Sequence, residues 1–561
     1  MMNSRKIIAL CLVLAMLLSV LAGCGGNSNN APAETQSQTS DQAQANDATE
    51  AVQPNVQVQT GSAVDASLTA DQIESAQRSV INYAVADDCL DFDPFTNNTG
   101  SKEALVGFYQ PLAYMINGEV VGCLMKDYSF TDDGLIMYGE IYDYITDSAG
   151  NNITADDVVF SYEMSEEFAN LGMKGFVDSF VATGDYTFEI HFSTKLGIGK
   201  MDKLIKFLVV SKKAYEDHDM HSDPIGTGPY VLTDHVSGYS FTYAKREDYW
   251  QTDPSLVTAR DMANVDTINF FVIGESVQRT IALKNGSVDA SVLIPAEDLD
   301  YFDASEDFWL SAVPDDLSLT LVGNCDPSHV TSDVNLRKAI FYAISNEAIL
   351  QSVYGGRGTA LHDWCPSWAV GYNSEWDAET DNYYSYDLDK AKEYLEQSSY
   401  QGETLVILTS NSAIFTDSAQ MLGAMLEQVG IKTEIKALDG TIVKQNYADV
   451  TAWDLYLTNN ATNTYWVDGI NGCLTTDKTT WDGSPNFWYE EELQNMLREY
   501  MQPENATPEN FEILRDYVID NALCYGIVNP LTYIVVPSWC SGVCLSYKKC
   551  MTPGGNTYLP E

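Results

Sequence analysis

The stretch DPIGTGPY, residues 223–230, places two glycines and a proline directly before a run of strand-forming residues. Gly226 and Gly228 allow a tight turn, and Pro229 fixes the backbone where the chain enters the next strand. The stretch is not a phosphate-binding loop, because no lysine follows it and the spacing G-x-x-x-x-G-K is absent. We therefore interpret it as a structural turn that identifies a fold and leaves the ligand open.

Predicted strands and helices alternate on both sides of this turn, which indicates an α/β architecture. The run 186–192 alternates apolar and polar residues and predicts a strand whose Tyr, Phe and Ile side chains face inward. Thr154 and Asp333 each precede an apolar-periodic run and are suited to cap the start of a helix. A third helix is expected to end at Gly430, and residues 431–435 should form the strand that follows it.

Further stretches accompany the turn in a fixed order along the chain. They are ITADDVVFSY (153–162), REDYW (246–250), ALKNGSVD (282–289), SDVNLRKAI (332–340) and YDLDKA (386–391). Together with the turn, these stretches resemble the extracellular solute-binding proteins of the oligopeptide, dipeptide and nickel importers, family 5 of the ABC-transporter binding proteins. The resemblance covers Tyr83 to about Val543, which is nearly all of the part expected to fold.

The resemblance implies an α/β fold of the two-lobed, periplasmic-binding-protein-like kind (type II, cluster C type), with a hinge between the lobes. The family also carries an extra domain on the first lobe. Mapped onto this sequence, lobe I would combine 77–105, 223–320 and 525–561, the extra domain would be 106–222, and lobe II would be 321–524. The ligand is expected between the lobes, and closure around it would be a hinge motion.

The N-terminus reads as a lipoprotein signal peptide over residues 1–23. Arg5 and Lys6 precede an apolar run that ends at Leu21, and at about 15 residues this run is shorter than the roughly 20 that span a bilayer as a helix. The junction LAGC, residues 21–24, resembles the lipobox of bacterial lipoproteins. The resemblance implies that Cys24 carries acyl chains and anchors the protein on the extracytoplasmic face of the cell membrane. The alternative is a chance cysteine behind a simple signal peptide.

Residues 24–76 are predicted to form a disordered stalk. Between 27 and 76 there is no aromatic residue, lysine or arginine, so this segment lacks the apolar surface that would order it. The formal net charge of −50 argues against a nucleic acid partner, because phosphate binding requires clustered Lys and Arg. The cysteines after Cys24 are scattered without a C-x-x-C pair, and we expect most of them to be small buried residues.

The resemblance also implies positions that bind the ligand. Family relatives that bind peptides commonly hold the ligand's amino group with an aspartate a few residues beyond a strand that resembles WDLYL, residues 453–457. The position that aligns with this aspartate is Asn463, and the nearest acid is Asp468. Tyr465 and Trp466 belong to the same stretch and are candidate ligand contacts. An ordinary surface loop is the alternative interpretation.

Four further candidates lie elsewhere in the chain. Tyr533 and Asn97 occupy positions that often touch the ligand in the family. Trp364 and Trp368 flank Pro366 in a predicted loop and are candidates to line the cleft. For each of the four, a scaffold role is the alternative.

We therefore expect a lipid-anchored, monomeric solute-binding protein that captures a short peptide and delivers it to the transmembrane subunits of an ABC permease. We expect no cofactor and no catalytic residue, since no G-x-S-x-G, H-E-x-x-H or Cys–His signature is present. His218 and His221 lie three residues apart in a very acidic stretch, where we expect a solvated loop and no metal site. A non-peptide solute (an oligosaccharide, an opine or a metal chelate) remains open, as does the different class of a surface hydrolase.

Overall fold

The computed structural model describes residues 80–538, apart from 98–104, 106, 117–118, 169–172, 174–175, 259–260, 293, 316, 378–382, 462–464 and 475–490. Cys24, the predicted stalk, Asn463 and the cysteines at 540, 544 and 550 lie outside the described residues. Within the described part, no helix has the combination of length and apolar character that crossing a membrane requires.

Twenty strands are distributed over the described chain. They are β1 (Val80–Val85), β2 (Gln110–Pro111), β3 (Ala113–Ile116), β4 (Glu119–Gly122), β5 (Met125–Phe130), β6 (Ile136–Ile141), β7 (Val177–Ala182), β8 (Thr187–Phe192), β9 (Leu208–Val209), β10 (Tyr230–Val236), β11 (Ser240–Lys245), β12 (Thr267–Val272), β13 (Ala290–Val292), β14 (Phe308–Pro314), β15 (Leu317–Gly323), β16 (Gly358–Ala360), β17 (Thr404–Ser410), β18 (Lys432–Leu438), β19 (Leu455–Ala461) and β20 (Cys524–Pro537).

The helices lie mainly between these strands. They are α3 (Ala155–Phe168), α4 (Lys200–Ile205), α5 (Lys212–Asp217), α6 (Ser276–Lys284), α7 (Ala296–Asp303), α8 (Val334–Tyr342), α9 (Asn346–Val353), α10 (Leu388–Gln397), α11 (Ala413–Gln428), α12 (Gly440–Ala448), α13 (Trp466–Leu474), α14 (Glu491–Tyr500) and α15 (Pro508–Asp520), with short 3₁₀ turns η2 (Pro254–Leu256), η3 (Val330–Ser332) and η4 (Ser374–Asp377).

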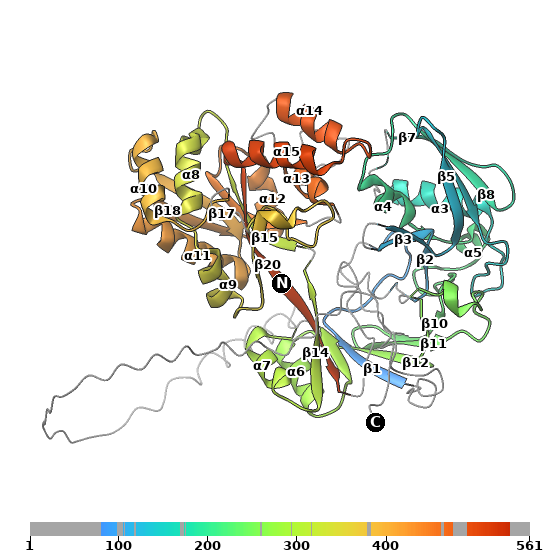
Figure 1. Cartoon of the computed structure of the whole chain (residues 1–561). Helices are drawn as coiled ribbons and strands as arrows, with labels where there is room; N and C mark the ends of the chain where they lie inside the picture. The colour runs from blue at the N-terminus through green and yellow to red at the C-terminus, as the bar shows by residue number, and fades with distance from the viewer. Residues whose placement is uncertain are drawn as a thin grey trace, which may run out of the picture. The chain divides into compact units, whose positions relative to one another are not determined.

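Strand β20 joins the two halves of the main sheet. The sheet has 12 strands in the order β10-β11-β12-β1-β13-β20-β15-β19-β17-β18, with β14 and β16 also paired to β20. The first part of β20 pairs with β15 and β16, and its later part pairs with β14 and β13. Figure 1 shows it as one long arrow that runs from the helices around β15 and β17 to β14.

Helices cover both faces of the half of the sheet that contains β15, β17 and β19. Leu319, Ile407 and Leu457 face a core formed with α8, α9 and α11. The opposite face packs on a second core, which we call the tryptophan cluster. Its members include Trp364, Trp376, Trp453, Trp466, Leu493, Leu497, Met501, Phe511 and Leu514.

A separate small sheet has the strand order β5-β6-β8-β7. Its inner face packs on α3, where Val158 and Tyr162 meet Phe180 and Phe188 in one buried cluster. Thr154 begins α3 as the sequence predicts, because the Asp157 carboxylate accepts hydrogen bonds from both the Thr154 backbone N–H and its hydroxyl, each at 2.8 Å. The strand and helices predicted at 186–192, 333 and 430 are confirmed as β8, α8 and α11.

Two close backbone approaches fix the turn at 223–230. A Cβ atom on Gly226 would lie 2.1 Å from the carbonyl oxygen of Phe108, and one on Gly228 would lie 2.2 Å from that of Gly107. The Gly228 N–H donates to the Phe108 carbonyl at 2.7 Å, and the Tyr230 N–H donates to the Gly107 carbonyl at 2.9 Å. A side chain at either glycine would separate these backbones, so the interpretation as a structural turn is confirmed.

Arg246 donates hydrogen bonds to carbonyl groups in and beside the same turn. Its guanidinium is almost fully buried and donates to the carbonyls of Asp147 at 2.9 Å and Gly228 at 3.1 Å. Buried carbonyl groups need such donors, because an unpaired polar group inside a protein is costly. The division into lobe I, extra domain and lobe II at the boundaries given above remains a prediction.

Gly228→Ala should destabilise the protein, because the new Cβ would lie 2.2 Å from the Gly107 oxygen. We expect a loss of about 1–3 kcal/mol in unfolding free energy, as for other overpacked interiors, measured by denaturant titration. Gly274→Ala is the matched control, since its Cβ would meet nothing nearer than the Ala86 oxygen at 3.7 Å. Equal midpoints for the two variants would contradict the role assigned to the close approach.

Candidate ligand-binding site

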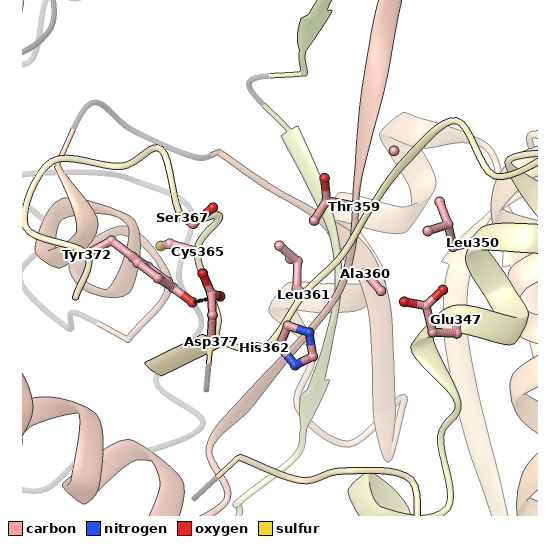
Figure 2. A pocket seen from close by; sticks show the side chains of 11 residues that line it. Glu347, Leu350, Thr359, Ala360, Leu361, His362, Cys365, Ser367, Tyr372 and Asp377 are labelled. Atoms are coloured by element: carbon pink, nitrogen blue, oxygen red, sulfur yellow. Dashed lines mark hydrogen bonds between the residues drawn. The ribbon is translucent and has the colours of Figure 1, made fainter. Parts of the chain in front are cut away.

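A hollow of about 350 Å³ lies beside β16. Figure 2 shows it between the side of α9 and the loop that follows β16, in front of β20. The lining residues are Glu347, Leu350, Gly358, Thr359, Ala360, Leu361, His362, Cys365, Ser367, Tyr372 and Asp377. All of them come from one continuous stretch of the predicted lobe II. We call residues 361–377 the site loop.

A buried ion pair holds the site loop in place. Asp363 accepts a hydrogen bond from Arg515 Nε at 2.8 Å, and the two side chains are 3% and 2% exposed. The Asp363 carboxylate also accepts from the indole Nε1 of Trp466 at 2.7 Å and from the backbone N–H of Cys365 at 3.3 Å. Burial raises the pKa of Asp363, and the charge of Arg515 opposes that shift. One carboxylate therefore ties the loop to both α15 and α13.

The site loop is also joined to the segment that contains the predicted amine-recognition residues. Val370 and Tyr465 form an isolated parallel bridge, and the Trp466 N–H donates to the Val370 carbonyl at 2.9 Å. The Trp364 indole donates to the Gly469 carbonyl at 3.4 Å. Two stretches almost one hundred residues apart in sequence thus form one surface beside the hollow.

The aromatic residues predicted to bind ligand divide into buried and accessible groups. Trp364 and Trp466 belong to the tryptophan cluster and are 2% and 0% exposed, so in this structure they support the loop. Trp368 is 38% exposed, and Tyr465 is half-buried. Trp368 and Tyr465 are therefore accessible to a solute, as is Tyr372, which lines the hollow.

Trp368 contacts β20, and Tyr533 belongs to that strand. The Trp368 indole donates to Asn529 Oδ1 at 3.2 Å, which connects the site loop to the middle of the strand. The half-buried Tyr533 ring lies 5.4 Å from the guanidinium carbon of Arg357. Burial raises the pKa of Tyr533, so the phenol stays neutral at physiological pH. Arg357 also pairs with Asp300 of α7 at 2.6 Å.

Asn97 occupies a different environment. Its side chain is 2% exposed and donates to the Asp91 carbonyl at 2.6 Å, which makes it part of a turn. Asp91 also pairs with His221 at 2.8 Å, whereas His218 pairs with Asp223 at 2.9 Å. The two histidines therefore have separate carboxylate partners. Among the described residues, no group of three or more His, Cys, Asp and Glu side chains is arranged to hold a metal ion.

None of the predicted ligand residues that the structure describes lines the hollow itself. The ion pair of Asp363 and Arg515, which organises the site, was not predicted from the sequence. Its one sequence signal is that Arg515 falls on the buried face of α15 together with Phe511, Leu514 and Val518. A charged residue in an apolar helical stripe needs a buried partner, but the partner's identity is not visible locally.

The hollow has the chemistry of a site for a polar solute. Glu347, His362 and Asp377 contribute ionisable groups at its exposed wall, and Thr359 and Ser367 contribute hydroxyls. Tyr372 donates its hydroxyl to Asp377 at 2.8 Å, as Figure 2 shows. The lining contains hydroxyl and carboxylate oxygens and no Lys or Arg. These oxygens would accept hydrogen bonds from a solute that presents N–H or O–H groups.

Comparison with known proteins identifies the family. Residues 119–481 match the sequence model of "Bacterial extracellular solute-binding proteins, family 5 Middle". The chain belongs to the family 5 extracellular solute-binding proteins. This confirms the resemblance noted from the motifs at 153–162 and 223–230.

Relatives and solved structures of this family are similar to the chain at low sequence identity. The dipeptide-binding protein of Escherichia coli K12 is 23% identical over 356 residues, which are 58% of this chain and 64% of that protein. The chain thus matches somewhat less than two thirds of that relative's length. The substrate-binding protein CtaP of Listeria monocytogenes superposes with a TM-score of 0.74 at 18% identity, over 86% of this chain and all of CtaP.

A third similar protein is DppA from Helicobacter pylori in complex with peptide STSA. It has a TM-score of 0.68 and 19% identity, over 87% of this chain and 99% of DppA. At these identities the structural matches establish the fold. They confirm the predicted mixed α/β, two-lobed type II class.

Asp363→Asn should break the buried pair and leave the Arg515 guanidinium without its counter-charge. We expect a loss of about 3–5 kcal/mol in unfolding free energy, the usual cost of removing one partner of a buried pair. The double variant with Arg515→Met should recover part of that loss, since both charges are then gone. Denaturant titrations of the single and double variants measure this coupling.

Lys126→Met is the control for the ion-pair prediction. Lys126 pairs with Glu140 at 2.5 Å, but the two side chains are 51% and 42% exposed. Exposed pairs contribute little, so this variant should unfold at nearly the wild-type midpoint. Additive effects of Asp363→Asn and Arg515→Met would contradict the coupling.

Proposed function

We propose that the protein is a lipid-anchored, extracytoplasmic solute-binding protein that captures a short peptide and delivers it to an ABC permease. The observation that carries the proposal is the family match over residues 119–481, on a fold whose main sheet crosses through β20. The solute would lie against the site loop and the Tyr465 segment, and the predicted lobe I would close over it about β20.

The shape of the site supports a peptide. Peptides bound in clefts are held largely through their main chains, and roomy, polar pockets accept varied side chains through water. The site loop offers a hollow of about 350 Å³ and hydroxyl and carboxylate oxygens. Trp368 and Tyr465 add accessible aromatic surface beside it. Together these features suit a ligand with a constant backbone and varied side chains.

The direct test is to identify what the protein binds. The purified full chain would be examined by native mass spectrometry for co-purifying solutes and then titrated by calorimetry with a tripeptide library. We expect saturable binding of one peptide per chain, with the peptide recovered intact. Hydrolysis of the peptides would place the protein in the hydrolase class. Binding of an oligosaccharide, opine or metal chelate with no peptide binding would overturn the peptide assignment and keep the transport role.

Cys24→Ser should release the protein from the membrane. The junction LAGC at 21–24 supports lipidation at Cys24, and several acyl chains give stable anchoring where one does not. Cell fractionation and immunoblotting of wild type and variant would measure retention. Cys11→Ser is the control, because Cys11 lies inside the apolar leader and away from the junction. Equal retention of Cys24→Ser and wild type would contradict the lipoprotein assignment.

The free and N-acetylated forms of the same peptide should have dissociation constants within a small factor of each other. Asn463 aligns with the family's aspartate and offers a carbonyl without charge, whereas an ionised acid would form a charge-assisted bond about twice as strong as a neutral one. Asp468, the nearest acid, points its carboxylate at Gly199. Calorimetry on the matched peptides measures the ratio of the two dissociation constants.

Two other outcomes of the acetylation experiment are informative. A large loss on acetylation that Asp468→Asn removes would show that Asp468 recognises the amine. A large preference for the free amine that survives Asp468→Asn would contradict the alignment of this loop.

A further inference from the structure

One segment of the predicted extra domain reaches the tryptophan cluster of the predicted lobe II. We call residues 195–203 the strap. They contain a turn at 197–199 followed by the first residues of α4. The Ile198 N–H donates to the Met501 carbonyl at 2.7 Å, and the Ile198 side chain packs against the tryptophan cluster. This contact therefore combines a main-chain hydrogen bond with apolar burial.

The glycines of the strap allow this close approach. A Cβ atom on Gly197 would lie 3.0 Å from the Met501 carbonyl oxygen. Gly199 has a φ of +80°, which L side chains rarely adopt, and a Cβ there would lie 2.8 Å from Oδ2 of Asp468. The Asp468 carboxylate is thus in direct contact with the backbone of the strap.

Lysines of the strap carry a charge opposite to that of the Asp468 carboxylate. Asp468 is half-buried, and burial raises its pKa, while Lys203 and Lys200 are the strongest of the charges that oppose the shift. Lys206 acts in the same direction, and Asp202 acts against it. A second pair, Lys195 with Glu504 at 2.7 Å, is half-exposed on both sides and so contributes little. Lys200 and Lys203 of the strap thus favour the ionised form of Asp468, which lies against the backbone at Gly199.

The position of Asp468 connects the strap to the candidate site. It lies in the first turn of α13, a helix that begins at Trp466. Tyr465 directly precedes this helix and is bridged to Val370 of the site loop. Burial raises the pKa of Tyr465, and Asp202 and Tyr128, both from the predicted extra domain, raise it further. A contact that fixes the start of α13 therefore also fixes the position of Tyr465 beside the site loop.

We propose that the strap is an intramolecular closure contact, in which Ile198 anchors the predicted extra domain on lobe II and Asp468 positions the start of α13. Asp468 acts through the helix that follows Tyr465 and is a positioning residue. This contact lies between two parts of the chain and includes no solute atom, so it goes beyond solute capture and can be tested without a peptide.

Hydrogen exchange on the ligand-free full chain tests the anchor. The backbone N–H of Ile198 is bonded across the contact, so a peptide spanning 197–199 should be protected in the wild type. Ile198→Asp should accelerate exchange there about tenfold or more, since the charge cannot enter an apolar cluster. Val181→Asp is the control, because Val181 is 42% exposed on β7 of the same predicted domain. Unchanged exchange in Ile198→Asp would overturn the proposal.

A charge-reversal cycle tests Asp468 and does not depend on whether Ile198→Asp folds. Asp468→Lys and Lys203→Asp should each accelerate exchange at 197–199 and in the first turn of α13. The double variant should restore most of the protection, because the two positions again carry opposite charges. If the charges of Asp468 and Lys203 do not act on each other, the losses of protection in the two single variants would add up in the double variant. That result would overturn the role of Asp468. Peptide binding plays no part in either readout, so failure here is separable from failure of the proposed function.

Discussion

Strand β20 is the constraint on which the rest of the fold depends. It is 14 residues long, and β13, β14, β15 and β16 all pair with it. At the crossing point Asp315 fixes the register: its N–H donates to the Pro530 carbonyl at 2.8 Å, and its carboxylate accepts from the Thr532 hydroxyl at 2.9 Å. The Asn529 amide donates to the Asp315 carbonyl at 2.8 Å and accepts from Trp368 at 3.2 Å. The same few residues thus hold the crossing and position an exposed aromatic side chain of the candidate site.

The site loop shows how a buried charge can determine local structure. Burying Asp363 and Arg515 costs desolvation energy, and their attraction offsets it only when the remaining hydrogen bonds are made. Trp466 and Cys365 supply those bonds, and the Arg515 guanidinium also lies 4.8 Å from the centre of the Trp376 ring. Alternative loop conformations would leave charges unpaired in an apolar cluster. The pair therefore selects one conformation of the loop, whatever its net contribution to stability.

Closure of a two-lobed binding protein requires surfaces that meet and can separate again. The strap has that character, because it combines one partly buried isoleucine, one main-chain hydrogen bond and charges near a half-buried aspartate. Such a contact is small compared with the cores on either side and can open without disturbing them. Asp468, the acid nearest in sequence to the predicted amine-recognition position Asn463, lies against Gly199 of the strap. The carboxylate of Asp468 is already engaged by the chain itself.

The sequence by itself determined the local elements and the family. The alternation at 186–192, the cap at Thr154 and the turn at 223–230 depend on residues close in the chain, so their physics is visible in a short window. The six cysteines that the structure describes are buried, as their scattered spacing suggested. Only the tertiary structure decided which side chains form the site. Trp364 and Trp368 are four residues apart, yet one is buried and the other exposed, because their partners Gly469 and Asn529 lie 105 and 161 residues away. Asp363 and Arg515 are separated by 152 residues, and Asp468 meets Gly199 across predicted domains. Burial and pairing over such distances depend on the crossing of β20, which no local pattern encodes.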